Sequence, residues 1–121
     1  MEARIMTDQQ LNRALAELMG WKLVYRIDGN ETNEGTEYWE TDKGFRQVDF
    51  WEPTTCQSDS SEVQAKAIEV DGTGYVRNLE IAKWGKIMAP LSRKEVSVLL
   101  TVSRRERAEA AYITLQGAQN G

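Results

Sequence analysis

Apolar residues recur at helical spacing in two stretches, one near each end of the chain, and both stretches begin at a capping box. Thr7 is followed three residues later by Gln10, and Ser103 by Glu106; in such a pair each side chain satisfies a backbone amide of the other residue. The stripes that follow are Leu11, Ala14, Leu15, Leu18 and Met19, and then Ala108, Ala111, Tyr112 and Leu115. We expect amphipathic helices that end at Gly20 and Gly117.

Between these helices, side chains alternate in the manner of strands. Trp21–Ile27 precedes a polar, acidic loop over residues 30–36, and a hairpin is expected from Glu37–Thr41 and Phe45–Trp51. Gly44 supplies the positive φ that the hairpin turn needs. A two-residue turn would place Trp39 opposite Arg46. Because both faces of the hairpin carry large apolar groups, we expect part of the sheet to be covered on both sides.

The second half of the chain also contains candidate helices and strands. We expect a short helix from Asp59 that stops before Asp71 and Gly72, and strands at Tyr75–Ala82 and Lys94–Thr101. Trp84–Pro90 is expected to be an exposed loop or a bulged extension of the strand before it. The predicted order is αβββαββα. Strands in hairpin-sized pairs indicate an α+β fold with a mainly antiparallel sheet of about five strands and three helices.

Composition bounds the chemistry of the chain. Its 121 residues suggest one domain, which we place at residues 7–117, with a flexible extension at 1–6 and a tail at 118–121. One cysteine, Cys56, suggests a reducing compartment. The absence of histidine from the sequence excludes histidine-based nucleophilic catalysis and histidine-ligated zinc. We therefore expect no enzyme, no cofactor and no metal.

Charge is unevenly distributed along the chain. Residues 1–60 carry 6 Lys and Arg against 12 Asp and Glu, a net −6, and residues 61–121 carry 9 against 7, a net +2. A pI near 4.9 argues against a duplex nucleic-acid binder. No apolar run is long enough for a membrane span, and residues 1–5 do not resemble a signal peptide, so we expect a cytoplasmic protein.

Several segments together resemble a known family. Leu11–Trp21 (LNRALAELMGW), the turn at Trp51–Thr55 (WEPTT) and Ser103–Gly117 (SRRERAEAAYITLQG) are similar to those of small phage and prophage proteins of the phage ABA-sandwich domain family. The resemblance implies a three-layer α/β/α sandwich, a phage origin and cytoplasmic action in an infected bacterium. Its motifs concern packing and capping, so it implies no particular chemistry.

The candidate ligand-binding residues are aromatic or basic. Aromatic rings stack on bases, and cations at a helix start fit a bound anion, because there they oppose the helix dipole. The residues that we assign to ligand binding are Trp39, Arg46, Trp51, Lys83, Trp84, Lys86, Arg104 and Arg105. The alternative for the tryptophans is the core, and for the cations a solvated surface.

The acidic residues of the hairpin region allow two interpretations. Glu37, Glu40, Asp42, Asp49 and Glu52 could form a hydrolase or hard-cation site, or could solubilise strand edges. Cys56 has no basic neighbour in sequence, which disfavours a reactive thiolate.

Two functions fit this chain. The first is a non-enzymatic, homo-oligomeric phage protein that sequesters a small anionic ligand, such as a nucleotide second messenger of host antiviral defence. The alternative is an adaptor that binds a host protein through the acidic hairpin surface.

Overall fold

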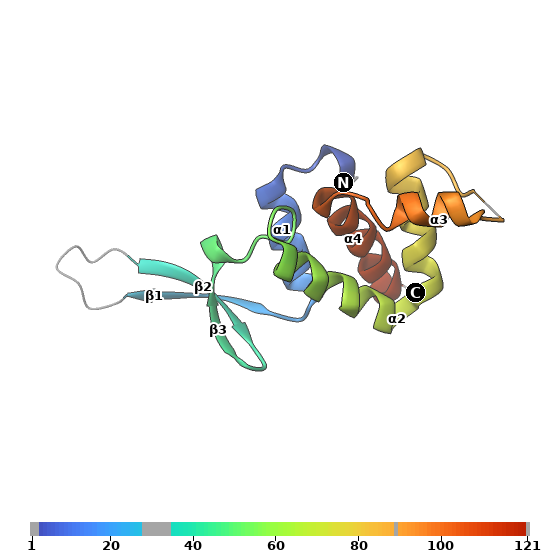
Figure 1. The fold of residues 1–121 in the computed structure, drawn as a ribbon. Coiled ribbons are helices and arrows are strands. Elements are labelled where there is room, and N and C mark those ends of the chain that lie inside the picture. Colours follow the sequence, from blue (N-terminus) through green and yellow to red (C-terminus); the bar gives the residue numbers. More distant parts are fainter. Residues whose placement is uncertain (1–2, 28–34, 89, 121) are drawn as a thin grey trace.

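The computed structural model describes residues 3–27, 35–88 and 90–120, which form an α+β fold. The elements within these ranges are η1 (Ala3–Ile5), α1 (Asp8–Leu18), β1 (Lys22–Ile27), β2 (Gly35–Thr41), β3 (Gly44–Gln47), η2 (Val48–Phe50), α2 (Gln57–Trp84), α3 (Arg93–Leu99) and α4 (Arg104–Asn120). The helices gather into one body, from which the sheet projects on one side and α3 on the other (Figure 1). None of the helices in these ranges is long and apolar enough to cross a membrane.

Both predicted terminal helices are confirmed. The Thr7 hydroxyl accepts from the amide of Gln10 at 3.1 Å, and the Ser103 hydroxyl accepts from that of Glu106 at 3.0 Å. The predicted stripes supply much of the core, including Leu11, Leu15, Ala108, Ala111 and Leu115. Gly20 has the left-handed φ of +86° expected after the first helix. The last helix continues through Gly117 as far as Asn120.

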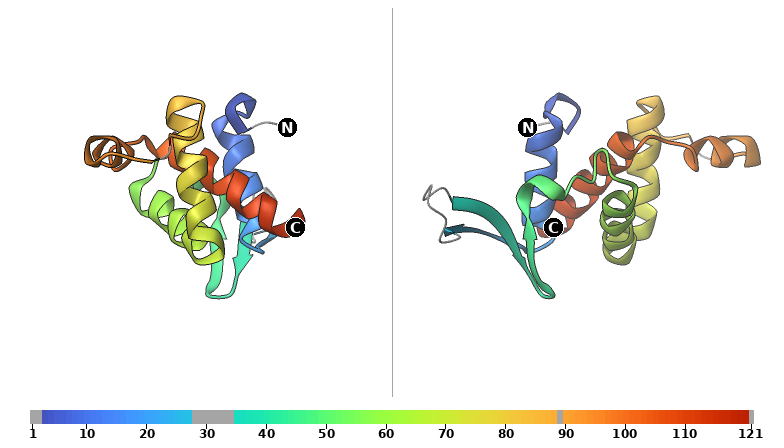
Figure 2. Two further views of the ribbon diagram at one scale, coloured as in Figure 1. Left: turned by 90° about the vertical axis from the view of Figure 1, so that its right-hand side faces the viewer. Right: turned by 60° about the vertical axis from the view of Figure 1, so that its left-hand side comes forward.

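The helical body is organised around α4. This helix lies between α1 and α2 and packs most extensively against α2 (Figure 2). The long helix α2 is kinked at Asp71, whose φ of −160° and ψ of 83° are not helical. The carboxylate of Asp71 accepts from the amide of Gly74 at 3.0 Å, which caps the second half. The predicted stop before Asp71 therefore corresponds to a kink, after which the helix resumes.

The sheet is antiparallel in the order β1-β2-β3. Trp39 pairs with Arg46 in the predicted register, and Gly44 in the turn has a φ of +117°. Trp39 is the one residue of β2 that is buried. The inner end of the sheet, where Trp39 meets the helices, therefore anchors it to the body.

The prediction of about five strands and three helices is wrong, because the described chain has three strands and four α-helices. The three-layer sandwich is wrong as well. Five of the six residues of β1 are exposed, and Tyr25 and Ile27 are each more than 60% exposed. Helices therefore do not cover both faces of this sheet. The expected strand Phe45–Trp51 also ends early, since Val48–Phe50 forms the turn η2.

The segment Tyr75–Ala82 is helical because its buried side chains follow helical spacing. Tyr75 and Leu79 are buried and Asn78 and Ala82 half-buried, which is the pattern i, i+3, i+4, i+7. The alternation that predicted a strand required Arg77 on the apolar face, and Arg77 is exposed. The polar residues that the helix buries have partners: Glu80 is 4% exposed and accepts from the amide of Met88 at 2.8 Å, and Asn78 donates to the hydroxyl of Thr114 at 2.9 Å.

The segment Lys94–Thr101 is mostly the helix α3, and a capping box explains it. The Ser92 hydroxyl accepts from the amide of Glu95 at 3.1 Å, and the Glu95 carboxylate accepts from that of Ser92 at 3.0 Å. The amide and hydroxyl of Ser92 hold the pKa of Glu95 below its usual value. Ser92 and Glu95 have the same spacing as the two correctly predicted boxes, so local capping prevails here over the β-propensity of the valines.

Candidate functional site

The eight predicted ligand-binding residues lie in three separate places. Trp39, Arg46 and Trp51 lie where the sheet meets the helices; Lys83, Trp84 and Lys86 lie at the end of α2; Arg104 and Arg105 begin α4. They therefore do not form one site, and each group has its own electrostatic environment.

The polar groups of the residues at the sheet are already paired within the protein. Arg46 donates to the carboxylate of Glu62 at 2.5 Å, and the indole N–H of Trp51 donates to the same oxygen at 3.1 Å. The Arg46 guanidinium also lies 5.0 Å from the ring of Trp21, which packs edge-on against Trp51. Because Trp51 is buried and Arg46 already has an acidic partner, this group holds the sheet on α2.

A hollow of about 520 Å³ borders Trp39, but its charge does not suit an anion. The charged residues that line it are Asp8, Arg13, Asp49 and Glu52. Arg13 is paired with Glu37 at 2.9 Å. Trp39 itself is 2% exposed, so its ring offers almost no face for stacking.

The group at the end of α2 has a simpler explanation. Trp84 is half-buried and packs against the core, while Lys83 and Lys86 are exposed. Gly85 ends the helix with a φ of +75°. Lysines in this position complement the partial negative charge of a helix C-terminus, which would itself repel a phosphate.

At the start of α4 lies a shallow hollow of about 380 Å³, which we call the α4 hollow. Its lining comes from the turn before α2, the first residue of α2 and the start of α4. The lining residues are Thr54, Thr55, Gln57, Val102, Ser103, Arg104, Arg105 and Arg107. Three are arginines and none is acidic, a combination that favours an anion.

The arginines of the α4 hollow are engaged to different degrees. Arg104 is exposed, and its Nε donates to the side-chain oxygen of Gln57 at 3.2 Å. Arg107 is half-buried and reaches the carbonyl of Leu100 at 3.3 Å with one nitrogen. Each guanidinium has further N–H groups for an oxyanion, because arginine carries five donors.

Arg105 is the most constrained of the three. It donates to the carboxylates of Asp8 and Glu109 at 2.6 and 2.8 Å, and to the carbonyls of Ala3 and Met6 at 2.8 and 2.6 Å. Burial lowers the pKa of Arg105, but the hydrogen bonds and charges of Glu109 and Asp8 outweigh it, so the pKa is raised. Arg105 thus holds η1 and α1 on α4, and its charge is compensated by Asp8 and Glu109. The positive charge of the α4 hollow therefore comes from Arg104 and Arg107.

Thr54 was not predicted as a site residue, and it adds a second observation. It is 5% exposed, and its hydroxyl has no hydrogen-bond partner among the described residues. The amide of Thr54 is fixed by the side chain of Asn12 at 3.2 Å, and the residue lies between the α4 hollow and the acidic hollow beside Trp39. The signal available in the sequence was the WEPTT turn, whose two threonines line the α4 hollow.

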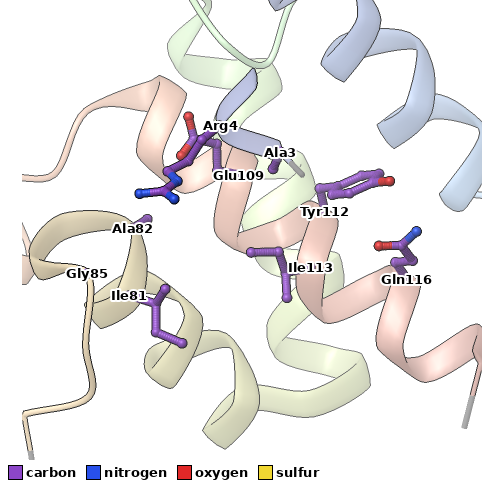
Figure 3. A pocket seen from close by; sticks show the side chains of 9 residues that line it. All are labelled: Ala3, Arg4, Ile81, Ala82, Gly85, Glu109, Tyr112, Ile113 and Gln116. Carbon is purple, nitrogen blue, oxygen red and sulfur yellow. The ribbon is translucent and has the colours of Figure 1, made fainter. Parts of the chain in front are cut away.

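The hollow in Figure 3 has a different character. About 590 Å³ in volume, it lies between η1, the end of α2 and α4. Ile81 and Ile113 form apolar walls, whereas Arg4 and Glu109 lie together at one end and Gln116 at the other (Figure 3). It contains neither a cluster of arginines nor an orphaned buried hydroxyl, so its residues select no ligand chemistry.

The acidic residues of the hairpin region do not converge. Across the described ranges, no three Asp, Glu or Cys side chains gather closely enough to hold a metal ion. Cys56 is half-buried, and its sulfur lies 3.3 Å from the hydroxyl of Ser58.

Comparison with known protein families, with curated proteins and with solved structures gave no match. The resemblance to the phage ABA-sandwich domain family therefore stays a prediction, and the site must be judged on its own geometry.

Proposed function

We propose that this protein is a non-enzymatic binding protein that takes up a small phosphate-bearing ligand in the α4 hollow. The observation that carries the proposal is the lining at the start of α4. It contains three arginines, of which only Arg105 is paired with carboxylates among the described residues, and the buried Thr54, whose hydroxyl has no partner among them. Sequestration of a nucleotide second messenger in the bacterial cytoplasm is the biological form of this proposal. A phage origin of the protein is part of the same proposal.

The start of α4 can supply both charge and directed donors. The first amides of a helix have no partner within it, and the capping hydroxyl of Ser103 takes only the amide of Glu106. The amides of Arg104 and Arg105 therefore remain for an anion, which the helix dipole also favours. An arginine fork adds paired N–H donors that match a phosphate.

The orphaned hydroxyl of Thr54 fits the same ligand. A buried hydroxyl without a partner costs about 1–3 kcal/mol. The oxygen itself is buried, so an anion bound in the α4 hollow would accept from it only after a rotation about χ1. An oxyanion that accepts from it would recover part of that cost.

The lining also limits the kind of ligand. None of the residues that line the α4 hollow is aromatic, so it offers no platform for a base. We expect recognition of the phosphate part of a nucleotide, with little discrimination among bases.

The test is a thermal-shift titration in phosphate-free buffer with inorganic phosphate, pyrophosphate and a cyclic dinucleotide. A ligand at 100 times its dissociation constant adds about 2.7 kcal/mol, which raises the Tm of a chain of this size by about 10 °C. Arg104→Glu should abolish the shift. Arg93→Glu, at the first position of α3, is the matched control and should retain it.

Two outcomes would contradict the proposal. One is the absence of any shift with all three compounds. The other is a shift that Arg104→Glu and Arg93→Glu reduce equally, since this would indicate only a response to net charge.

Thr54→Val separates the hydroxyl from the charges. It keeps the shape of the side chain but removes the orphaned oxygen, so we expect the apo protein to be unchanged or up to about 1 kcal/mol more stable. The same variant should bind pyrophosphate about threefold to tenfold more weakly. Equal affinity for both proteins would exclude the hydroxyl from the site.

A further inference from the structure

The outer edge of β1 is open to an additional strand. β1 pairs with β2 over six consecutive positions, and no described strand lies on its other side. β1 contains no proline or glycine, and its pairing with β2 has no bulge. The sheet projects away from the helical body (Figure 1). An edge of this kind presents unpaired N–H and C=O groups that another chain can use.

The two largest side chains of β1, Arg26 and Tyr25, extend over the sheet and leave the backbone of the open edge uncovered. On one face, the Arg26 guanidinium reaches across to lie 5.9 Å from the ring of Tyr38 and 5.0 Å from that of Phe45, on β2 and β3. On the other face, the Tyr25 hydroxyl accepts from the amide of Gly35 at 2.9 Å. The Tyr25 ring lies over Gly35 so closely that a Cβ there would come within 2.0 Å of it.

The side chains of β1 define the chemistry of a fitting strand. Leu23, Tyr25 and Ile27 share one face and are 45%, 64% and 62% exposed. Lys22 and Arg26 lie on the other face, and β1 contains no acidic residue. Within the protein, Lys22 already faces Glu40 of β2.

We infer that the β1 edge binds an extended segment of another protein in which apolar and acidic residues alternate. Apolar residues would extend the row of Leu23, Tyr25 and Ile27. Acidic residues would lie on the face of Lys22 and Arg26, where Arg26 would turn from Tyr38 and Phe45 toward the edge to meet them. Charge complementarity favours this partner over a second copy, because two β1 strands side by side would bring four cations together. This inference does not depend on the α4 hollow.

Fluorescence anisotropy with labelled peptides of about ten residues tests the inference. A peptide that alternates valine and glutamate should bind, and its counterpart with lysine in place of glutamate should bind at least tenfold more weakly. Strand addition also predicts a dependence on backbone phase. N-methylation of the valines or of the glutamates should abolish binding in one case only, because alternate amides face β1.

Exchange of one charge pair provides the matched variant. Lys22→Glu with Glu40→Lys keeps the attraction between β1 and β2 but leaves Arg26 as the one cation of β1 beside a new acid, so β1 carries no net charge. The preference between the two peptides should then be lost. Lys43→Glu, in the turn between β2 and β3, should leave the preference unchanged.

Three results would overturn the inference: no binding of the glutamate peptide, equal binding of both peptides, or equal effects of both N-methylated forms. A dimer whose formation competes with the glutamate peptide would also overturn it, because the edge would then serve a second copy. Sedimentation of the unliganded protein detects that dimer.

Discussion

Removal of the Arg105 side chain should destabilise this protein more than any other single change to a surface cation. Its four hydrogen bonds join α4 to η1 and to the start of α1. The side chain is 25% exposed, so we count about 1 kcal/mol for each carbonyl and about 0.5 kcal/mol for each carboxylate. Arg105→Ala should therefore cost about 3 kcal/mol and lower the Tm by about 12 °C.

Urea unfolding followed by tryptophan fluorescence measures this loss. Arg105→Lys keeps the charge but not the fork, so it should recover no more than about half of the stability. Arg93→Ala, at an exposed position on α3, is the control and should change stability by less than about 0.5 kcal/mol. Trypsin should also cleave after Arg4 faster in Arg105→Ala. If Arg105→Ala destabilised the protein no more than Arg93→Ala does, the hydrogen bonds of Arg105 would not be what holds η1 and α1 on α4.

Two further predictions concern the core. Burial raises the pKa of Tyr75 far above its usual value, against a smaller opposing effect of Arg107. The stability that depends on neutral Tyr75 is thus complete below about pH 10 and is lost as the pH rises further. Between neutral and alkaline pH, the Tm should fall less steeply with pH for Tyr75→Phe than for the unchanged protein. Loss of the hydrogen bond to Gln64 lowers the Tm of this variant at neutral pH. Identical slopes for the two proteins would refute the prediction. Glu62→Ala should cost about 1–2 kcal/mol in urea unfolding, because Arg46 and the Trp51 indole lose a shared acceptor; a cost near zero would show that this network does not hold the sheet.

The helices that the sequence predicted correctly are those in which capping and periodicity agree. At both ends of the helical body, a capping box precedes an unbroken apolar stripe, and both helices form as expected. The segment Lys94–Thr101 gave conflicting signals, since its β-branched residues favour a strand but the box at Ser92 begins a helix. Propensity was the weaker of the two signals, because the first four amides of a helix have no partner within it and must be satisfied locally.

The candidate site could be predicted only in part. Placement of Arg104 at a helix start follows from the capping box at Ser103. The approach of Thr54 to that start depends on how α2 packs on α4, which is a contact over about fifty residues of sequence that no local pattern encodes. The burial of Trp39 and Trp51 is likewise tertiary, because a tryptophan beside polar loops has the same local pattern on the surface and in the core.

Backbone amide NMR tests most directly whether an anion binds at the start of α4. Pyrophosphate should be titrated into the ¹⁵N-labelled protein at constant ionic strength. We expect saturable shifts of the amides of Arg104 and Arg105, smaller shifts at Thr54 and Gln57, and none at Lys83 or Lys86. Saturable shifts confined to the end of α2 or to the sheet, or no saturable shift at all, would contradict the proposal.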